Sequence, residues 1–505
     1  MFKRLIDPFV TLSPDRIVLA LLPIGFIAAA VASGAIIASE NVVMIALVGG
    51  ALLSAVLLGA PSVALWVVLV GVLLVSGPLI FHFPALERIR WLFSVLGLFL
   101  LVAAFLHGGL ARRRNVNPVP VFIWIAITLV IYAVASMLWA EVPLNQSGAG
   151  ARRTIHYWGI MFALALIAFS DRTVFRWILF VCVLGLIQWP YAIYQRVVVH
   201  PTLQFSGAFD SIAGTFEVST SGFGGSTGAL AFMLCLLIGG AFAAYREKLI
   251  GVPILAACVA ALMLPIAVGE TNVVFIWLPL VLAIVYADQL RRRPILFLTG
   301  SAVFAVLLVA FATVYLVTQQ AHQGAPVPFE TRLKDTYEYN FGSRGYANAS
   351  DLNRSNVIPY WFKHNGLEDP VRATFGHGIG SAYADRDFMT PLFIRHSYRS
   401  ISLVAVAEFL WELGLVGATL FLAMIAFAIR SAFRLVQTVR PGVDRAVARS
   451  LLVGNVLLLS LVFYDSAFIT TASQQVVAVL VLGLTAWMER RSQPCSPSGA
   501  RTGAA

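Results

Sequence analysis

Long apolar segments separated by short polar turns make up most of this chain. An α-helix rises about 1.5 Å per residue, so about 20 apolar residues cross the ~30 Å hydrocarbon core of a bilayer. Fourteen segments are candidates for such helices. They are residues 17–38, 42–59, 62–81, 91–110, 119–139, 154–169, 174–193, 226–245, 251–268, 271–287, 295–317, 403–429, 447–465 and 470–487. The pattern predicts an all-α, polytopic membrane protein with about fourteen transmembrane helices.

One long polar segment, residues 318–401, interrupts this pattern between the eleventh and twelfth predicted spans. The predicted units are therefore spans 1–11 in residues 1–317, a loop domain in 318–401, spans 12–14 in 402–489, and a tail in 490–505. Four of the eight histidines lie in the loop, and His200 lies in another loop of the same predicted side. We expect chemistry on water-soluble groups in this loop and its neighbours. The four are His322, His364, His377 and His396.

Two local patterns stand out inside the loop. Residues 355–364 read SNVIPYWFKH, which is apolar enough for a short amphipathic helix on the membrane surface. Residues 375–381 read FGHGIGS, which predicts a tight glycine turn. This turn is weak as a nucleotide motif, because no strand precedes it and no Lys-Ser or Lys-Thr ends it.

Composition and charge support the membrane assignment and give an orientation. The 505 residues are 59% hydrophobic and 12% charged, with a mean hydropathy of +0.86, so a soluble globule of this size would lack polar surface. Basic residues concentrate in the loops that a cytoplasmic N-terminus would place inside, including Arg112–Arg114, Arg291–Arg293 and the group from Arg430 to Arg449. Both termini are then cytoplasmic and the long loop faces outward. The net charge of +11 matches this bias and anionic lipid headgroups, without nucleic acid as a partner.

Cysteine and histidine usage argues against a metal site. Cys182, Cys235 and Cys258 lie in predicted spans and Cys495 in the inner tail, which leaves the outer loops without thiols. The histidine spacing fits no standard zinc pattern. We therefore expect neither a metal nor a disulfide on the outer face.

Four short stretches, in order, resemble those of the O-antigen ligase and polymerase superfamily, including its exopolysaccharide polymerases. The first is Ser136–Pro143 with Arg152-Arg153 after it, and the second is Gly214-Thr215-Phe216 with Gly228–Ala231 opening a helix. The third is Asn353-Arg354, Trp361 and Phe375–Gly380, and the fourth is His396 followed by Trp411–Gly417. The similarity covers roughly residues 119–429, and each motif is short.

Three features of this chain depart from the family pattern. Ser397 follows the histidine where relatives usually have Asn, and the gap from His396 to Glu412 is longer than usual. His364-Asn365 supplies the expected dipeptide ahead of the glycine turn and ranks second. At the outer turn where relatives often have Ser-Arg, this chain has Glu270-Thr271-Asn272, so no arginine carries over there.

The resemblance implies a membrane glycosyltransferase of the GT-C-like helical class in a bacterial inner membrane, with the loop in the periplasm. Its substrate would be a polyprenyl-diphosphate-linked oligosaccharide, used without nucleotide sugar, metal or cofactor. A polymerase that joins repeat units into exopolysaccharide or O-antigen is the first expectation, with a chain-length regulator and export machinery as candidate partners. A ligase that transfers the glycan to a lipid acceptor is the alternative.

Transfer from a diphosphate requires stabilisation of the leaving charge and deprotonation of an acceptor hydroxyl. Arginine grips phosphate oxygens in a fork, and a near-neutral histidine accepts a proton. His396 is the predicted base, with His377 a secondary candidate that also fits a plain turn residue. Six outer-face arginines are candidates for the diphosphate, although each also fits a helix end anchored to headgroups. They are Arg152, Arg153, Arg196, Arg354, Arg395 and Arg399.

Carboxylates complete the candidate site. Glu408 and Glu412 share a helix face at roughly 9 and 15 Å from the outer end of their span, so we expect one to face a cavity or an arginine rather than lipid. A structural interhelical pair is the competing interpretation. Glu270, near the outer surface, is a further candidate. Aromatic side chains of the long loop fit either sugar stacking or an interfacial belt.

A lipid-linked oligosaccharide flippase or a proton-coupled exporter is the alternative from another class, and a non-catalytic scaffold remains a third. A carrier would place charges along a path through several spans and would have short outer loops. Here the clear intramembrane charges are Glu408 and Glu412 of one predicted helix. The pattern therefore favours transfer chemistry.

Overall fold

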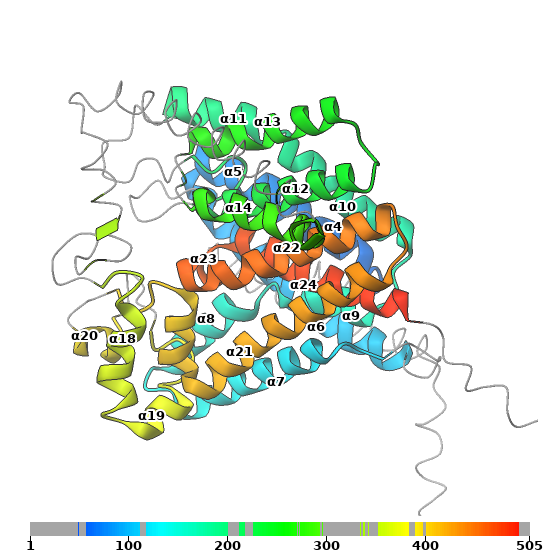
Figure 1. Ribbon diagram of the computed structural model, residues 1–505. Helices are drawn as coiled ribbons and strands as arrows, with labels where there is room; N and C mark the ends of the chain where they lie inside the picture. Colours follow the sequence, from blue (N-terminus) through cyan, green and yellow to red (C-terminus); the bar gives the residue numbers. More distant parts are fainter. Residues whose placement is uncertain are drawn as a thin grey trace, which may run out of the picture.

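The computed structural model describes residues 57–111, 118–199, 212–217, 226–269, 271, 273–292, 352–382, 389–396 and 400–493, with a few isolated positions besides. All regular elements within these ranges are helical (Figure 1). Eight helical segments are long and apolar enough to cross a membrane: 61–82, 90–108, 121–139, 171–199, 227–246, 405–438, 443–464 and 472–492. Each coincides with a predicted span, which confirms the helical, membrane-type architecture.

The helical elements follow in chain order, with η denoting π-helices and 3-10 helices. The first half contains α4 (Pro61–Val70), η1 (Gly71–Val75), α5 (Ser76–His82), η2 (Pro84–Ile89), α6 (Arg90–Ala111), α7 (Val121–Ala135), η3 (Ser136–Trp139), α8 (Leu144–Ile155), α9 (Trp158–Leu166), α10 (Asp171–Leu186), α11 (Gln188–Tyr194), η4 (Gln195–Val199) and α12 (Thr227–Arg246). The second half contains α13 (Val252–Val268), α14 (Val274–Val285), α15 (Ala287–Arg292), α18 (Val357–Trp361), η7 (Phe362–Gly366), α19 (Pro370–Phe375), α20 (Pro391–Arg395), α21 (Ala405–Thr438), α22 (Val443–Tyr464), α23 (Ala467–Thr470) and α24 (Ala472–Ser492).

Six of the fourteen predicted spans are not among these eight. Spans 17–38, 42–59 and 295–317 lie wholly or mostly outside the described residues. Spans 251–268 and 271–287 correspond to the shorter apolar helices α13 and α14. The expected span 154–169 is not continuous, because α8 ends at Ile155 and α9 begins at Trp158.

Helices α9 and α24 form the centre of the bundle. Residues 158–165 of α9 and 473–488 of α24 are buried, and α24 packs against α9, α12, α21 and α22. A helix that is apolar on all sides is stable only when it is enclosed by other helices or by lipid. Enclosure by other helices allows α9 to be helical although it is only 9 residues long.

Helix α21 was expected to be one continuous span over residues 403–429, and the structure corrects this. Gly414 has φ +64° and ψ −166°, so the helix is broken there and resumes after it. Only glycine adopts this conformation at low cost. The break lies just after Glu412 and therefore in the candidate site.

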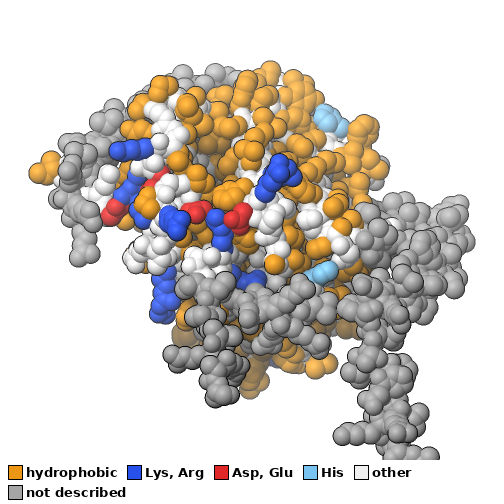
Figure 2. Space-filling model, turned by 90° about the vertical axis from the view of Figure 1, so that its right-hand side faces the viewer, with side chains coloured by type: hydrophobic (Ala, Val, Ile, Leu, Met, Phe, Trp, Pro, Cys, Tyr) orange, Lys and Arg blue, Asp and Glu red, His pale blue; other side chains and the backbone are white. Residues whose placement is uncertain are grey.

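The connecting segments sort into two ends. Helices α18, α19, α20 and α23 and the start of α21 lie at one end, which we call the loop end (Figure 1). The turns 247–251 and 439–442 lie at the other, which we call the opposite end. Figure 2 looks onto the opposite end, where basic and acidic side chains alternate across the surface. Their pairs are Arg246–Asp288, Arg449–Glu247, Arg491–Asp171 (3.0 Å) and Arg491–Asp444 (2.9 Å).

Candidate functional site

The predicted glycine turn is present and docks onto the break in α21. Gly376, Gly378 and Gly380 all have positive φ, between +76° and +89°. The backbone N–H of His377 donates to the carbonyl of Trp411 (2.9 Å), and that of Gly378 donates to the carbonyl of Glu412 (2.8 Å). Carbonyls that precede a helix end have lost their helical partners, and here the turn replaces them. The turn is therefore a packing element and not a phosphate loop.

The other side of the turn contacts the segment from Ser136 to Gly150. The N–H of Ile379 donates to Ser136 Oγ (3.0 Å), and the N–H of Glu141 donates to the carbonyl of His377 (3.2 Å). A Cβ added to Gly150 would lie 2.4 Å from the Cα of Gly380, so the two backbones are in direct contact. Residues far apart in sequence thus form one compact layer at the loop end.

His377 sits at the centre of a buried polar network. Its Nδ1 is 3.2 Å from a Glu141 carboxylate oxygen, and its Nε2 is 3.1 Å from Asn365 Oδ1. Glu141 also pairs with Arg372 at 3.0 Å. Burial lowers the pKa of His377, and this effect outweighs the opposing effect of Glu141. The two ring nitrogens of His377 thus link polar groups from two other segments of the chain.

Glu408 faces an arginine, as expected for a carboxylate at this depth. Its Oε1 is 2.9 Å from Arg153 Nη1, and its Oε2 accepts a hydrogen bond from Nη2 (3.4 Å), so both carboxylate oxygens lie against the guanidinium. The Glu408 side chain is 2% exposed and the Arg153 side chain 13% exposed. This geometry supports the structural interhelical pair, since Arg153 is already committed to a carboxylate.

Glu412 is also buried, and it is held by the loop. Its Oε1 accepts a hydrogen bond from the N–H of Ala382 (3.2 Å), just beyond the glycine turn. The turn thus fixes Glu412 twice, through its backbone carbonyl and through its side chain.

His396 lies in an aromatic group beside the same break. It follows α20, it is 8% exposed, and its ring centroid is 4.7 Å from that of Trp411. Its Nδ1 is 3.0 Å from the hydroxyl of Tyr360, and its ring is 6.0 Å from that of His364. His396 therefore contacts Trp411, the residue that directly precedes Glu412 in the chain.

The expected surface helix at 355–364 is helical but partly buried. Val357 and Trp361 are 0% and 3% exposed and belong to the core, and α18 packs against α21. Phe362 on the other side is 56% exposed. The helix therefore serves to position Tyr360 near His396.

The candidate arginines are dispersed around the loop end. The Arg152 guanidinium lies 3.8 Å from the ring centre of Trp91, and Arg354 lies 4.1 Å from that of Tyr464. Arg354 Nε also donates to the carbonyl of Tyr464 (2.6 Å). Arg196 is in η4, and Arg395 is exposed at the end of α20. Arg152 and Arg354 thus contact different aromatic rings, and Arg196 and Arg395 belong to different helical elements.

Arg90 is a further arginine that the sequence did not indicate, and it directly precedes Trp91, whose ring Arg152 faces. Arg90 Nε is 3.4 Å from Glu217, which is 8% exposed. Burial raises the pKa of Glu217, and Arg90 acts against that shift. Gln195, which directly precedes Arg196, accepts from the N–H of Gly214 (2.8 Å), so Arg90 and Gln195 both contact the segment 212–217.

Buried hydroxyls without a protein partner lie in the docked layer. Ser147 and Ser381 are each 1% exposed, and neither hydroxyl has a hydrogen-bond partner in the described part of the chain. A Cβ added to Gly380, beside Ser381, would lie 3.2 Å from the Cα of Ser147. Buried polar atoms are as a rule hydrogen-bonded in native proteins, so each of these hydroxyls calls for a partner.

Arg399, Glu270 and His200 lie outside the described residues. Sequence reasoning assigned no individual role to five residues of the site: Glu141, Tyr360, Asn365, Arg372 and Asp465. The first three lie inside quoted motifs and could have been found there, whereas Arg372 and Asp465 carry no local signal. Burial raises the pKa of Asp465, with Arg354 opposing this.

Comparisons with known proteins add no family assignment. No protein-family model matches the chain, and no curated protein matches it. Within the described ranges, no group of three or more His, Cys, Asp or Glu residues is placed to hold a metal ion. The arrangement offers a histidine oriented by a phenol, buried carboxylates and basic groups, which together are suited to proton transfer beside an anionic substrate.

Proposed function

We propose that this protein is a membrane glycosyltransferase that lengthens glycans carried on a polyprenyl diphosphate, acting at its loop end on the periplasmic side of a bacterial inner membrane. The observation that carries the proposal is the packing of the glycine turn onto Trp411, Glu412 and Ser136. Three of the four stretches with family resemblance contact one another through this turn. The fourth, around Gly214, lies next to Arg90 and Gln195.

The proposed reaction has a simple atom balance. An acceptor sugar hydroxyl attacks the anomeric carbon of the donor, and a new glycosidic C–O bond forms. The C–O bond to the diphosphate breaks, and its electron pair leaves with the polyprenyl diphosphate. His396 Nε2 takes the hydroxyl proton, in the tautomer whose Nδ1–H donates to Tyr360. The hydroxyl of Tyr360 can accept this Nδ1–H bond, so the contact is compatible with a base at Nε2 and helps to orient the ring.

Arginines near the segment 212–217 are the best candidates for the diphosphate. Arg152 and Arg196 keep this role in the proposal, and Arg90 joins them. Arg153 and Arg354 contact Glu408 and Tyr464, so we assign them to positioning. Charge neutralisation by a guanidinium fork suits a diphosphate leaving group.

A pair of matched histidine variants tests the base. His396→Gln should lower the rate of glycan lengthening by roughly 100-fold to 10,000-fold, the usual contribution of general base catalysis. His364→Gln is the control, because its ring lies 6.0 Å away in the same group and is more exposed. Loss of activity in His364→Gln alone would move the base to His364, and full activity in both variants would refute the assignment.

The acceptor distinguishes polymerase from ligase and from carrier. Purified protein is incubated with lipid-linked repeat units, with and without a lipid A core acceptor. A ladder of longer lipid-linked glycans supports a polymerase, and a single product on the core supports a ligase. Movement of unchanged substrate across a vesicle membrane would instead support a carrier.

A further inference from the structure

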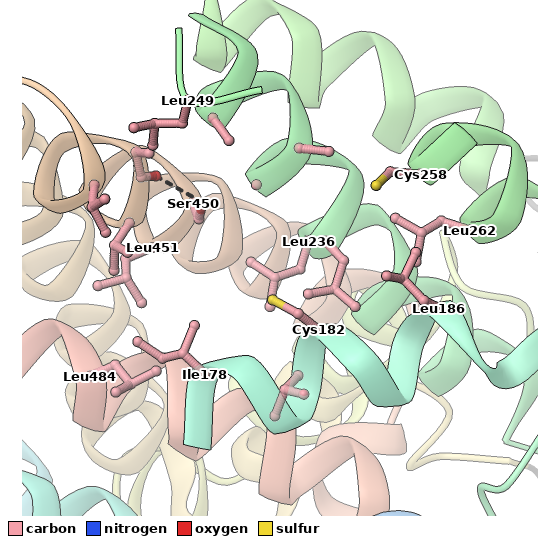
Figure 3. Close-up of a pocket in the computed structure, with 18 of the residues that line it drawn as sticks. Ile178, Cys182, Leu186, Leu236, Leu249, Cys258, Leu262, Ser450, Leu451 and Leu484 are labelled. Carbon is pink, nitrogen blue, oxygen red and sulfur yellow. Dashed lines mark hydrogen bonds between the residues drawn. The ribbon is translucent and has the colours of Figure 1, made fainter. Parts of the chain in front are cut away.

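An apolar cavity of about 330 Å³ lies between α10, α12, α13, α22 and α24 (Figure 3). Aliphatic side chains line it, together with the thiols of Cys182 and Cys258. Ser450 supplies the one hydroxyl among the described lining residues, and it donates to the carbonyl of Ala446 in its own helix (2.9 Å). The lining therefore offers packing contacts to a hydrocarbon and no unpaired hydroxyl to a polar ligand.

The cavity opens to the outer surface of the helical bundle near the opposite end. Leu249, Ile254 and Val443 belong to its lining and are 43%, 54% and 52% exposed. An apolar cavity of about 150 Å³ accommodates benzene, so this one has room for on the order of ten carbons of a chain. A lipid chain in the bilayer is already in hydrocarbon, so packing contacts rather than the hydrophobic effect would hold it here.

The rim of the cavity carries excess positive charge. Lys248 is exposed and directly precedes the lining residues Leu249 and Ile250. The N–H of Gly442 donates to Glu247 (2.9 Å), which brings the turn with Arg440 next to Lys248. Two of the neighbouring acids have a basic partner each, because Glu247 pairs with Arg449 and Asp288 with Arg246, while Asp444 shares Arg491 with Asp171. Among the residues described, neither Lys248 nor Arg440 has a carboxylate partner.

We infer that this cavity binds one anionic glycerophospholipid, with an acyl chain between the helices and its phosphate at Lys248 and Arg440. Basic pockets between membrane helices recognise anionic headgroups, and each basic residue near the surface strengthens that attraction. The acyl chain would fill the apolar cavity, and Lys248 and Arg440 would make binding selective for an anionic headgroup. The site is distinct from the loop end, so it stands or falls independently of the glycosyltransferase proposal.

Native mass spectrometry of the full-length protein after delipidation tests the chain position. We expect wild type to retain one phosphatidylglycerol and to bind it again from mixed micelles. Ala241→Phe fills the cavity and should abolish this binding, whereas Leu179→Phe on the exposed side of α10 should not. Equal phosphatidylglycerol binding by wild type and Ala241→Phe, or equal loss in both variants, would overturn the inference.

Charge variants test the headgroup position without touching the core. Wild type should prefer phosphatidylglycerol to phosphatidylcholine, and Lys248→Gln with Arg440→Gln should reduce that preference on the order of thirtyfold. Lys363→Gln, an exposed lysine at the loop end, should leave it unchanged. Equal affinity of wild type for the two lipids would contradict the proposed site.

Discussion

Two glycines of α8 provide a matched test of the docked glycine turn. Gly148 and Gly150 are both helical, and alanine at either position gains up to about 1 kcal/mol in helix propensity. A Cβ on Gly148 would meet nothing within 4 Å, so Gly148→Ala should raise the free energy of unfolding by up to about 1 kcal/mol. The same change at Gly150 meets the backbone of Gly380.

The expected cost at Gly150 follows from the geometry. The new Cβ would lie 2.4 Å from Gly380 Cα, and ordinary carbon contacts begin near ~3.5 Å, so the segments must separate by roughly 1 Å. The turn then loses or weakens its four hydrogen bonds to Trp411, Glu412 (two) and Ser136. At about 1 kcal/mol each, less about 1 kcal/mol gained in the helix, Gly150→Ala should cost about 3 kcal/mol.

Denaturant-induced unfolding in micelles measures this difference, and the lengthening assay reports its consequence. A shift of about 1 Å at a catalytic group can cost about 100-fold in rate, so Gly150→Ala should lose activity by about that factor. Gly148→Ala should keep the activity of wild type. If both variants change stability in the same direction and by similar amounts, the turn does not contact α8 as described.

Three other predictions concern buried polar groups. Replacing either Arg153 or Glu408 by an apolar residue should lower the free energy of unfolding by about 3–5 kcal/mol, whereas replacing both should lower it less. A double-mutant cycle measures this difference, and additive losses would argue against a pair. The pKa of His377 is lowered in the folded protein, so the unfolded chain binds this proton more readily and the stability should fall as the pH drops below ~6.5 toward the folded pKa. His377→Gln should flatten that part of the plot of Tm against pH, and an unchanged slope would exclude His377 as its source. Gln475→Met should lower the free energy of unfolding by roughly 2–4 kcal/mol in unfolding titrations, because the Gln475 amide donates to the Thr154 carbonyl and accepts from the Tyr157 N–H. Gln474→Met should be near neutral, because the Gln474 amide has no partner among the described residues. The opposite ranking of the two variants would show that these contacts are wrong.

The sequence predicted local features well. Hydropathy located the eight long spans, because an apolar run of about 20 residues has few alternatives to a membrane helix. The glycine spacing predicted the turn at residues 375–381, and the cost of an intramembrane carboxylate predicted a partner for Glu408. Each of these follows from residues close together in the chain.

Features that depend on distant contacts were not predictable in the same way. Nothing in the apolar run around Gly414 signals a break, because the carbonyls it frees are satisfied by residues 377 and 378. Arg153 and Glu408 are 255 residues apart, so their pairing left no local pattern. The role of His377 depends on burial by Glu141 and Asn365 from two other segments.

The stoichiometry of product release tests the central proposal most directly. Purified protein in vesicles is given polyprenyl-diphosphate-linked repeat units, and both glycan length and free polyprenyl diphosphate are measured. Transfer at the loop end predicts one free polyprenyl diphosphate for each new glycosidic bond. Substrate that crosses the bilayer with its length unchanged and no free polyprenyl diphosphate would contradict the proposal.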